Sequence, residues 1–516
     1  MERCLRILCA VAIAAGSLWR LWRLDSIPYG LDIDEGAILY WARRSFAEGR
    51  WLAFSPEFTR WEMFPGYFYE AVAAVSGLAR LGPALLGLAE IALVGVVARA
   101  VSGARAAWLA MALLSLCPWH LFYSRVPGTC VGVSLWMLTA TWLVAKGRSP
   151  WWAHAAGILH YTVFRLFWGV RLVSALAARQ WRVAGAAAGG AALAIVITAI
   201  SGSPIGDLFS RGSYNLTRPR MDVVENLWAT VLAPFTGLGP RYAHTTALFM
   251  ADYVHGGLAE ALAGAPPLGY GLALAAGVGL ILLVGELARK RQAASALARE
   301  VPLVIIGLVA LGPLGPSLSR LLWLTPWFAL AGAHAIEALF RRGRGALALC
   351  AVTLVLASGA ATQARVWAAL GDRDRMEPFF HSRHRVIADW ISRRIPDAHP
   401  GRVFWMTAGA YPSARYWEQR TSRFTLLPHL APETTEPFLS ASSSFSQTFI
   451  VDYVASRSPT ISGYDHRPRL AENIARLQGR AEILEDEEIL DDAGHPIGRR
   501  LEIRWPWAGY SRFSAH

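Results

Sequence analysis

Long apolar runs, separated by short basic stretches, constrain this chain more than any other feature of its sequence. A helix needs about 20 apolar residues to cross the hydrocarbon core of a bilayer, and about eleven segments approach that requirement. We expect spans over residues 5–24, 83–101, 106–122, 128–145, 151–164, 166–178, 183–201, 268–287, 301–318, 321–340 and 345–362. Residues 151–164 and 166–178 are short, and predict either two tilted spans or one broken span. The sequence therefore predicts a polytopic α-helical membrane protein.

The composition supports this class. Hydrophobic residues make up 54% of the 516 residues and charged residues only 17%, whereas a soluble domain carries about 25% charged residues. The 22 tryptophans also fit a protein with two lipid–water interfaces. The formal net charge of +13 is spread between apolar runs and is not gathered on one polar domain. We therefore expect membrane lipid, and no nucleic acid, among the partners.

Basic residues between the spans predict the orientation, because loops on the cytoplasmic side of a membrane are rich in Lys and Arg. With a cytoplasmic N-terminus, every loop expected on that side is basic. These residues are Arg3, Arg6, Arg99, Arg105, Lys146, Arg148, Arg179, Arg182, Arg289, Lys290, Arg291, Arg299, Arg341, Arg342 and Arg344. Counting residues 65–80 as a span would invert this pattern, so we expect an interfacial helix there. The predicted location is the inner, cytoplasmic membrane.

The same topology divides the chain into two domains. Residues 1–363 form the expected membrane domain, with external loops over residues 25–82 and 202–267. Residues 364–516 are less apolar and predict a small extracytoplasmic α/β domain. Its expected helices are 383–395, 412–420 and 470–480, and its expected strands are 402–408, 446–454 and a last strand within 491–505.

Charged residues gather on the expected external side. The stretch IPYGLDIDEGAILYWARR, residues 27–44, contains three carboxylates, and four arginines lie at the external ends of later segments. The carboxylates are Asp32, Asp34 and Glu35, and the arginines are Arg125, Arg165, Arg211 and Arg320. Charges at membrane depth are costly and usually face a cavity or a partner. Capping of a helix start is the alternative for the acids, and anchoring at the lipid headgroups is the alternative for the arginines.

An acidic region opposite a basic region suits a phosphate-bearing lipid substrate. Arginine binds phosphate oxygens through two parallel hydrogen bonds and keeps its charge. A carboxylate can accept the proton of a hydroxyl that attacks a sugar, as a general base. The arginines would then stabilise the lipid phosphate as it leaves.

Several segments resemble the GT-C superfamily of glycosyltransferases, in particular bacterial relatives of the dolichyl-phosphate-mannose protein mannosyltransferases and of the aminoarabinose lipid A transferase. The similar segments are PYGLDIDEGAILYWARR, RAAWLAMALLSLCPWHLFYSR, GILHYTVFRL, SPIGDLFSR and SRLLWLTPWFALAGAHAIE, in this order. The resemblance covers roughly residues 10–345. It implies a GT-C-like fold and an inverting transfer from a polyprenyl-phosphate sugar to an acceptor hydroxyl on the extracytoplasmic face.

The resemblance also implies roles for the acids. Asp34 matches the catalytic carboxylate, Glu35 lies beside it, and Asp32 is an additional acid that competes for either role. Some relatives carry a second Asp soon after the Ser-Arg pair, and SRVPGTCVGVSLW has none. We therefore favour a metal-independent reaction in which arginines stabilise the leaving group, with a divalent cation, Mg or Mn, as the alternative. A transporter or flippase of lipid-linked sugars, and a lipid-linked glycan polymerase or ligase, are the competing functions.

Overall fold

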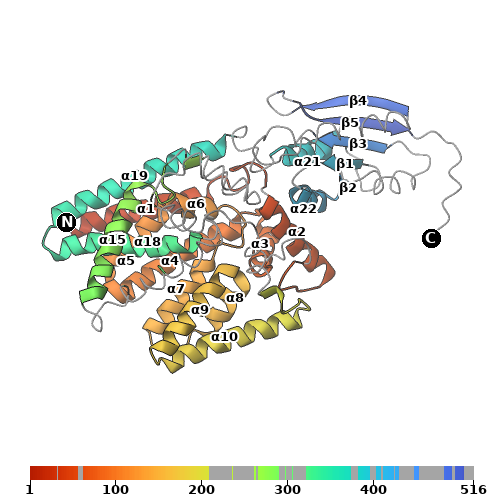
Figure 1. The fold of residues 1–516 in the computed structure, drawn as a ribbon. Helices are drawn as coiled ribbons and strands as arrows, with labels where there is room; N and C mark the ends of the chain where they lie inside the picture. The colour runs from red at the N-terminus through yellow and green to blue at the C-terminus, as the bar shows by residue number, and fades with distance from the viewer. Residues whose placement is uncertain are drawn as a thin grey trace, which may run out of the picture. The chain divides into compact units, whose positions relative to one another are not determined.

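The structure of the chain is a computed structural model, drawn as a ribbon in Figure 1. The residues that it describes are 1–31, 33–55, 62–208, 235, 261–262, 265–289, 297, 305, 321–372, 382–395, 403–407, 411–423, 425–428, 447–452, 482–490, 494 and 496–504. Contacts between residues divide the chain into two compact units. The first comprises Met1–Ile27 and Trp41–Leu370, and the second comprises Pro28–Tyr40 and Gly371–His516.

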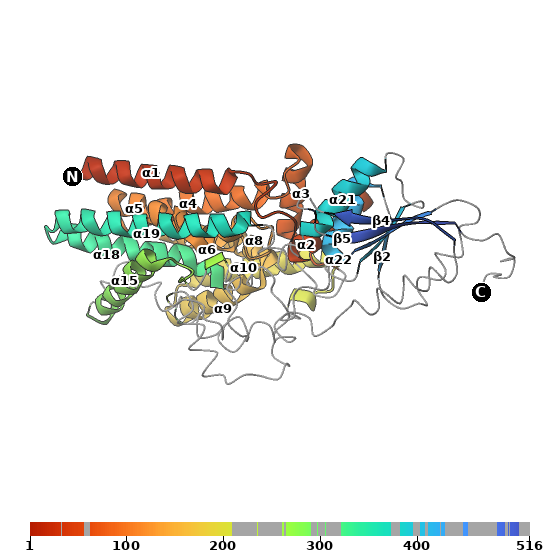
Figure 2. The same cartoon turned by 90° about the horizontal axis from the view of Figure 1, so that it is seen from above.

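The first unit is a bundle of helices. Its described elements are α1 (Glu2–Leu21), the second half of α2 (Ile33–Glu48), α3 (Phe64–Ser76), α4 (Leu81–Ser102), α5 (Ala104–Ser115), α6 (Pro118–Tyr123), α7 (Val133–Ala145), α8 (Trp151–His160), α9 (Thr162–Ala177), α10 (Trp181–Ile200), α15 (Tyr270–Arg289), the 3₁₀ turn η2 (Leu322–Leu324), α18 (Thr325–Arg341) and α19 (Gly345–Gly371). Figure 2 shows α1, α18 and α19 running alongside one another.

Five described helices are long and apolar enough to cross a membrane: α1, α4, α10, α15 and α19. Their outer faces carry large exposed apolar side chains, such as Ile7, Ile281 and Leu354, as expected of helices that are surrounded by lipid. Small residues allow some of these helices to approach closely. A Cβ atom on Gly279 of α15 would collide with the carbonyl oxygen of Ala331 on α18. The chain is a multi-pass membrane protein.

Two expected spans are interrupted helices. The span predicted at 106–122 is split into α5 and α6, because Pro118 cannot continue a helix and disfavours helical geometry in the residue before it. Residues 151–178 form α8 and α9, separated by Tyr161 in an extended conformation (φ −158°, ψ 144°). The expected span at 301–318 lies almost wholly outside the described residues.

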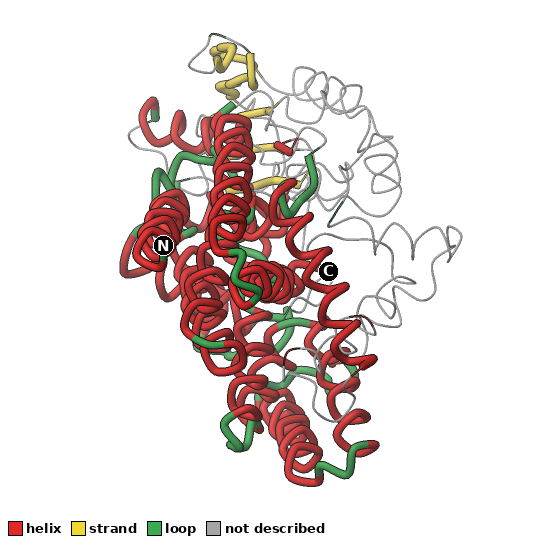
Figure 3. The backbone as a smooth tube through the Cα atoms, turned by 90° about the vertical axis from the view of Figure 1, so that its left-hand side faces the viewer, coloured by secondary structure: helices red, strands yellow, loops and turns green. Residues whose placement is uncertain are grey.

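The second unit contains a mixed five-stranded sheet. Its described elements are the first part of α2, α21 (Ser382–Arg394), β1 (Val403–Thr407), α22 (Tyr411–Thr421), β2 (Thr425–Pro428), β3 (Gln447–Asp452), β4 (Glu482–Leu490) and β5 (Pro496–Arg504). The strand order is β2-β1-β3-β5-β4. β1 pairs in parallel with β2 and β3, whereas β5 pairs antiparallel with β3 and β4. Figure 3 shows these strands in yellow, grouped together.

β2 and β4 were not predicted from the sequence. β4 reads EILEDEEIL and has little of the apolar alternation that marks a strand. Its acids are matched by arginines on the neighbouring strand β5. Arg499 binds Asp486 with 2.9 Å between Nε and Oδ1, and Arg500 binds Glu487 with 3.2 Å between Nη1 and Oε2. Opposite charges across a strand pair stabilise the pairing, so β4 forms despite its composition.

Candidate active site

The acidic cluster lies at the start of α2, in the second unit. The helix begins at Ile33, so Asp34 and Glu35 occupy its first turn and Asp32 directly precedes it. Glu35 is fully buried, whereas the side chains of Asp32 and Asp34 lie outside the described part of the chain. Acids in a first turn are stabilised by the helix dipole. The backbone therefore accounts for acids at these positions, and their catalytic role stays a prediction.

Arg125, which follows α6, is fully buried and donates four hydrogen bonds to main-chain carbonyls. Its Nη1 donates to Trp19 (2.7 Å) and Arg20 (2.9 Å), and its Nη2 donates to Arg23 (3.1 Å) and Ile27 (2.6 Å). These carbonyls belong to the last turn of α1 and to the chain just after it, where helix carbonyls have no partner within the helix. Arg125 therefore fixes the point at which the chain leaves α1.

The surroundings of Arg125 leave little room for a substrate. Its guanidinium also packs on the ring of Trp367, 4.5 Å from the ring centre. Burial, reinforced by the positive charges of Arg80 and Arg20, lowers the pKa of Arg125 to about 9, so the cation still predominates at neutral pH. A phosphate that approached this guanidinium would have to displace carbonyls that are bound to it.

Arg20 of α1 donates to carbonyls in the last turn of α5, as Arg125 donates to carbonyls in the last turn of α1. Its Nη1 donates to the carbonyls of Gly16 (2.7 Å) and Ser115 (2.8 Å), and its Nη2 donates to Leu114 (3.3 Å). Gln363 of α19 also donates to Ser115, at 2.9 Å. Because α5 ends at Ser115 inside the bundle, the Ser115 carbonyl would otherwise be buried without a donor, at a cost of several kcal/mol in a bilayer, whereas Leu114 also accepts from the Cys117 N–H at 3.2 Å.

His120 connects Arg20 to a buried carboxylate, Glu90. The distance from Arg20 Nη2 to His120 Nδ1 is 2.7 Å, and the distance from His120 Nε2 to Glu90 Oε2 is also 2.7 Å. A guanidinium only donates, so Nδ1 accepts and Nε2 carries the proton that is given to Glu90. The other Glu90 oxygen accepts from the Ser134 hydroxyl and from the Leu135 N–H, at 3.2 Å in the latter case. The network joins one cation to one anion through a neutral imidazole.

The connection between α6 and α7 is buried and held at two carbonyls. The Tyr69 hydroxyl donates to Gly128 (3.0 Å), and His160 Nε2 donates to Val131 (2.5 Å). The Trp136 indole donates to His160 Nδ1 at 3.0 Å, and because an indole only donates, the His160 proton must be on Nε2. This is the connection that lacks the second Asp of some relatives, and the structure fixes it through its main chain.

Arg165, the fourth residue of α9, has different partners. Its Nη2 pairs with Oε1 of Glu62 at 3.2 Å, and its Nη1 donates to the Leu208 carbonyl at 2.7 Å and to the Thr162 hydroxyl at 3.2 Å. Its Nε donates to the Ile158 carbonyl at 3.2 Å. The Arg165 side chain is 14% exposed, whereas the Glu62 side chain is fully buried. This cation therefore reaches the surface of the first unit while a buried anion orients it.

The residues around this pair come from distant parts of the chain. The Arg165 guanidinium lies 5.4 Å from the ring centre of Phe54, and Phe54 forms a β-bridge with Glu62. The hydroxyl of Ser203, just after α10, accepts from the N–H groups of Ala53 (3.1 Å) and Phe54 (3.3 Å). The segment after α2 is thus tied to the chain after α10, and Arg165 lies where the two meet.

Glu62 was missed in the sequence analysis. The available signal was that Arg165 needs a partner at membrane depth, and Glu62 lies in the same expected external loop, 25–82, as the three acids that were selected. Arg211 and Arg320 lie outside the described residues. Within the described part of the chain, no three His, Cys, Asp or Glu side chains gather where they could hold a metal ion.

No family model and no curated protein matches the sequence. Solved structures are similar in fold. ArnT from Cupriavidus metallidurans, solved with undecaprenyl phosphate bound, is 15% identical over 96% of this chain and 97% of its own, with a TM-score of 0.56. The oligosaccharyltransferase of Archaeoglobus fulgidus, in a complex with Zn and sulfate, is 14% identical over 86% of this chain and 68% of its own, with a TM-score of 0.54. The chain therefore shares its fold with these two proteins.

Proposed function

We propose that this protein is an integral membrane glycosyltransferase that moves a sugar from a polyprenyl-phosphate donor to an acceptor hydroxyl, with inversion at the anomeric carbon. The observation that carries this proposal is the fold that the chain shares, over 96% of its length, with an ArnT whose structure holds undecaprenyl phosphate. The external acids and arginines of the sequence supply the chemistry that such a transfer needs.

Arg165 is the described arginine that best suits the lipid phosphate. It is partly exposed, it keeps its charge, and Glu62 and the Leu208 carbonyl hold its planar fork in one orientation. An oriented guanidinium loses little freedom when it binds a phosphate, and here the phosphate would take over part of the hydrogen bonding that Arg165 now gives to the Leu208 and Ile158 carbonyls and the Thr162 hydroxyl. As the bond between the sugar and the phosphate breaks, charge grows on the phosphate oxygens and Arg165 stabilises it.

Asp34 is the proposed base, with Glu35 and Asp32 as the neighbouring acids. The carboxylate takes the proton of the acceptor hydroxyl as that oxygen attacks the anomeric carbon. A new bond forms between this carbon and the acceptor oxygen, and the bond from the carbon to the phosphate oxygen breaks. The electron pair leaves with the polyprenyl phosphate, and a single displacement inverts the anomeric centre.

The remaining predicted residues keep supporting roles in this proposal. Arg211 and Arg320 are further contacts for the donor phosphates, and Arg125 holds the exit of α1 that leads into the acidic segment. A divalent cation, Mg or Mn, would supply a Lewis acid at the phosphate, and the acids at 32, 34 and 35 are the side chains that could hold it. Chelation with EDTA is expected to leave the transfer rate unchanged in the metal-independent reaction.

The proposed topology places the reaction on the extracytoplasmic face of the inner membrane. The basic residues between the spans support a cytoplasmic N-terminus. The second unit, with its five-stranded sheet, is then an extracytoplasmic α/β domain.

Membranes that contain the full chain, supplied with labelled polyprenyl-phosphate sugars, test the proposal by the appearance of free polyprenyl phosphate and glycosylated acceptor. Asp34→Asn is expected to lower the transfer rate by about 10² to 10⁴, the usual contribution of a positioned base, while donor binding persists. Glu48→Gln, in the last turn of the same helix and exposed, is the matched control. Undiminished transfer in Asp34→Asn would move the base to Glu35, and no transfer from any such donor by the unaltered protein would reject the function.

A further inference from the structure

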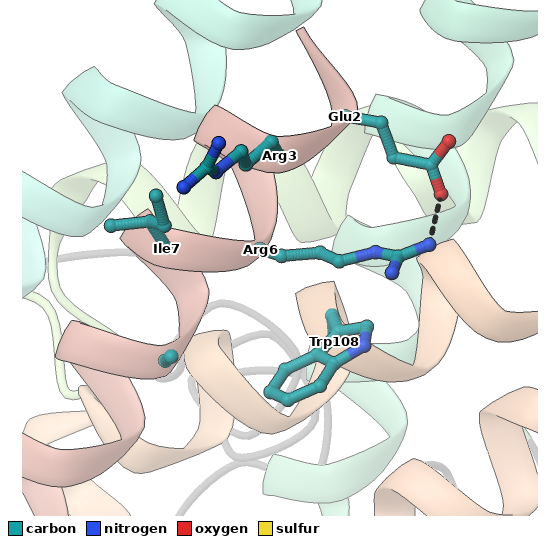
Figure 4. Close-up of a pocket in the computed structure, with 6 residues that line it drawn as sticks. Glu2, Arg3, Arg6, Ile7 and Trp108 are labelled. Atoms are coloured by element: carbon teal, nitrogen blue, oxygen red, sulfur yellow. Dashed lines mark hydrogen bonds and ion pairs between the residues drawn. The ribbon is translucent and has the colours of Figure 1, made fainter.

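A groove on the bundle surface lies between α1 and α5, far along α1 from the Arg125 region. Its volume is about 470 Å³, and its lining residues are Glu2, Arg3, Arg6, Ile7, Ala10 and Trp108. Figure 4 shows Arg6 extending from α1 toward the side of α5, with Trp108 close by. α1 is one of the candidate membrane spans, so the outer side of this groove faces lipid.

The chemistry of the groove changes along α1 in the order in which it changes along a phospholipid. Arg3 and Arg6 lie in the first two turns, and Ile7, Ala10 and the Trp108 indole follow toward the middle of the helix. Ile7 is 54% exposed. A glycerophospholipid presents its phosphate at the membrane surface and its acyl chains below it, and an indole favours the boundary between the two.

The local charge favours an anion. The ion pair between Arg6 and Glu2, 2.7 Å long, is exposed on both sides and is therefore weak. Arg3 makes no hydrogen bond or ion pair within the described part of the chain. Further arginines lie at the same end of the bundle: Arg341 donates to the Ser102 carbonyl at 3.5 Å, and Arg105 pairs with Glu337 at 3.3 Å.

We propose that this groove binds an anionic glycerophospholipid. The phosphate contacts the guanidinium group of Arg6, Arg3 adds positive charge at the same end of α1, and one acyl chain lies along Ile7, Ala10 and Trp108. Basic grooves between transmembrane helices are the usual recognition sites for anionic headgroups. The site is separate from sugar transfer and does not depend on it.

The test uses the purified full chain in phosphatidylcholine nanodiscs that contain increasing amounts of phosphatidylglycerol, with bound lipid counted by native mass spectrometry. The unaltered protein is expected to retain phosphatidylglycerol at least about fivefold over phosphatidylcholine, as one charged contact would give. The double variant Arg3→Gln/Arg6→Gln is expected to lose this preference. Arg342→Gln/Arg344→Gln removes the same charge from exposed positions outside the groove and is expected to keep it.

Three results would overturn the proposal. Equal retention of both lipids by the unaltered protein would show that no anionic lipid is selected. An equal loss in both double variants would show only a diffuse surface potential. Displacement of the bound lipid by millimolar glycerol 3-phosphate, which lacks acyl chains, would reduce the groove to a phosphate site. Trp108→Ala is expected to weaken retention of phosphatidylglycerol while the protein stays folded, because the acyl chain loses its contact with the indole.

Discussion

Arg125 and Arg165 belong to the same helical unit, but their guanidinium groups have different partners. Arg125 is fully buried and bound to four main-chain carbonyls, whereas Arg165 is partly exposed and pairs with the carboxylate of Glu62 in addition to two carbonyls. Arg125 supplies hydrogen-bond donors to carbonyls at the end of α1 and just after it. Glu62 instead orients Arg165 and leaves one side of it near the surface. Arg125 therefore belongs to the fold, whereas Arg165 is the arginine that we propose for the lipid phosphate.

The largest expected effect is that of Arg125→Met. This change leaves the carbonyls of Trp19, Arg20 and Ile27 without their donor, whereas the Arg23 carbonyl still accepts from main-chain N–H groups. Each buried unsatisfied acceptor costs about 1–3 kcal/mol, so we expect at least about 3 kcal/mol less stability, measured as the loss of folded protein on heating in detergent. An unchanged unfolding temperature in this variant would contradict the fold-stabilising role of Arg125.

Glu90→Leu is expected to have the next largest effect. It leaves the buried cation of Arg20 without its anion, and breaking a buried ion pair on one side costs about 3–5 kcal/mol. The same thermal measurement applies, with the exposed Glu48→Leu as the control, which is expected to change stability by less than about 0.5 kcal/mol. If both variants were equally stable, the network around His120 would contribute nothing to folding.

Arg165→Lys is expected to affect transfer more than folding. Lysine keeps the charge but loses the planar pair of donors that matches a phosphate. We expect the KM for the lipid-linked donor to rise, and kcat/KM to fall about 10- to 100-fold, which corresponds to about 1.4–2.8 kcal/mol. Arg182→Lys, at an exposed position of α10, is the control. Loss of folding without a change in KM would place Arg165 in the same class as Arg125.

Arg6→Gln is expected to have the smallest effect on stability. The pair that it breaks, with Glu2, is exposed on both sides, and such pairs contribute about 0–1 kcal/mol. Thermal unfolding in the same detergent should differ from that of the unaltered protein by less than about 0.5 kcal/mol. A larger loss would mean that exposure is a poor guide to the role of arginines in this protein.

The apolar periodicity of the sequence predicted where most helices lie, because long apolar runs have few other structures in a bilayer. The sequence also offered one broken span over residues 151–178 as an alternative, with its break after residue 164, whereas the structure breaks at Tyr161. It did not predict that Pro118 would split the span at 106–122, although a proline inside an apolar run is a local signal. The short helices α5 and α6 were not predicted, because the expected helix length was taken from hydropathy and the proline within the apolar run was not used as a helix break.

The partners of the buried charged residues could not be predicted from the sequence. Arg20 binds carbonyls 94 and 95 positions away, and Arg165 binds a carboxylate 103 positions away. Composition shows that a buried cation needs partners, but only the packing of helices selects them. From the sequence, Arg125 was expected to bind a lipid phosphate or the membrane headgroups, and main-chain carbonyls were not expected. Glu62 was not predicted, because it is a single acid in its segment, whereas Asp32, Asp34 and Glu35 form a cluster.

The break between α5 and α6 predicts which residues should occur together in homologous sequences. A chain with a helix-forming residue in place of Pro118 could run one continuous helix through this depth, and the carbonyls of Leu114 and Ser115 would then find donors in their own helix. The guanidinium at position 20 would then no longer be needed for the carbonyls of α5, and the amide at position 363 would no longer be needed for Ser115. In homologous chains, these two residues and the proline should be inherited together or lost together.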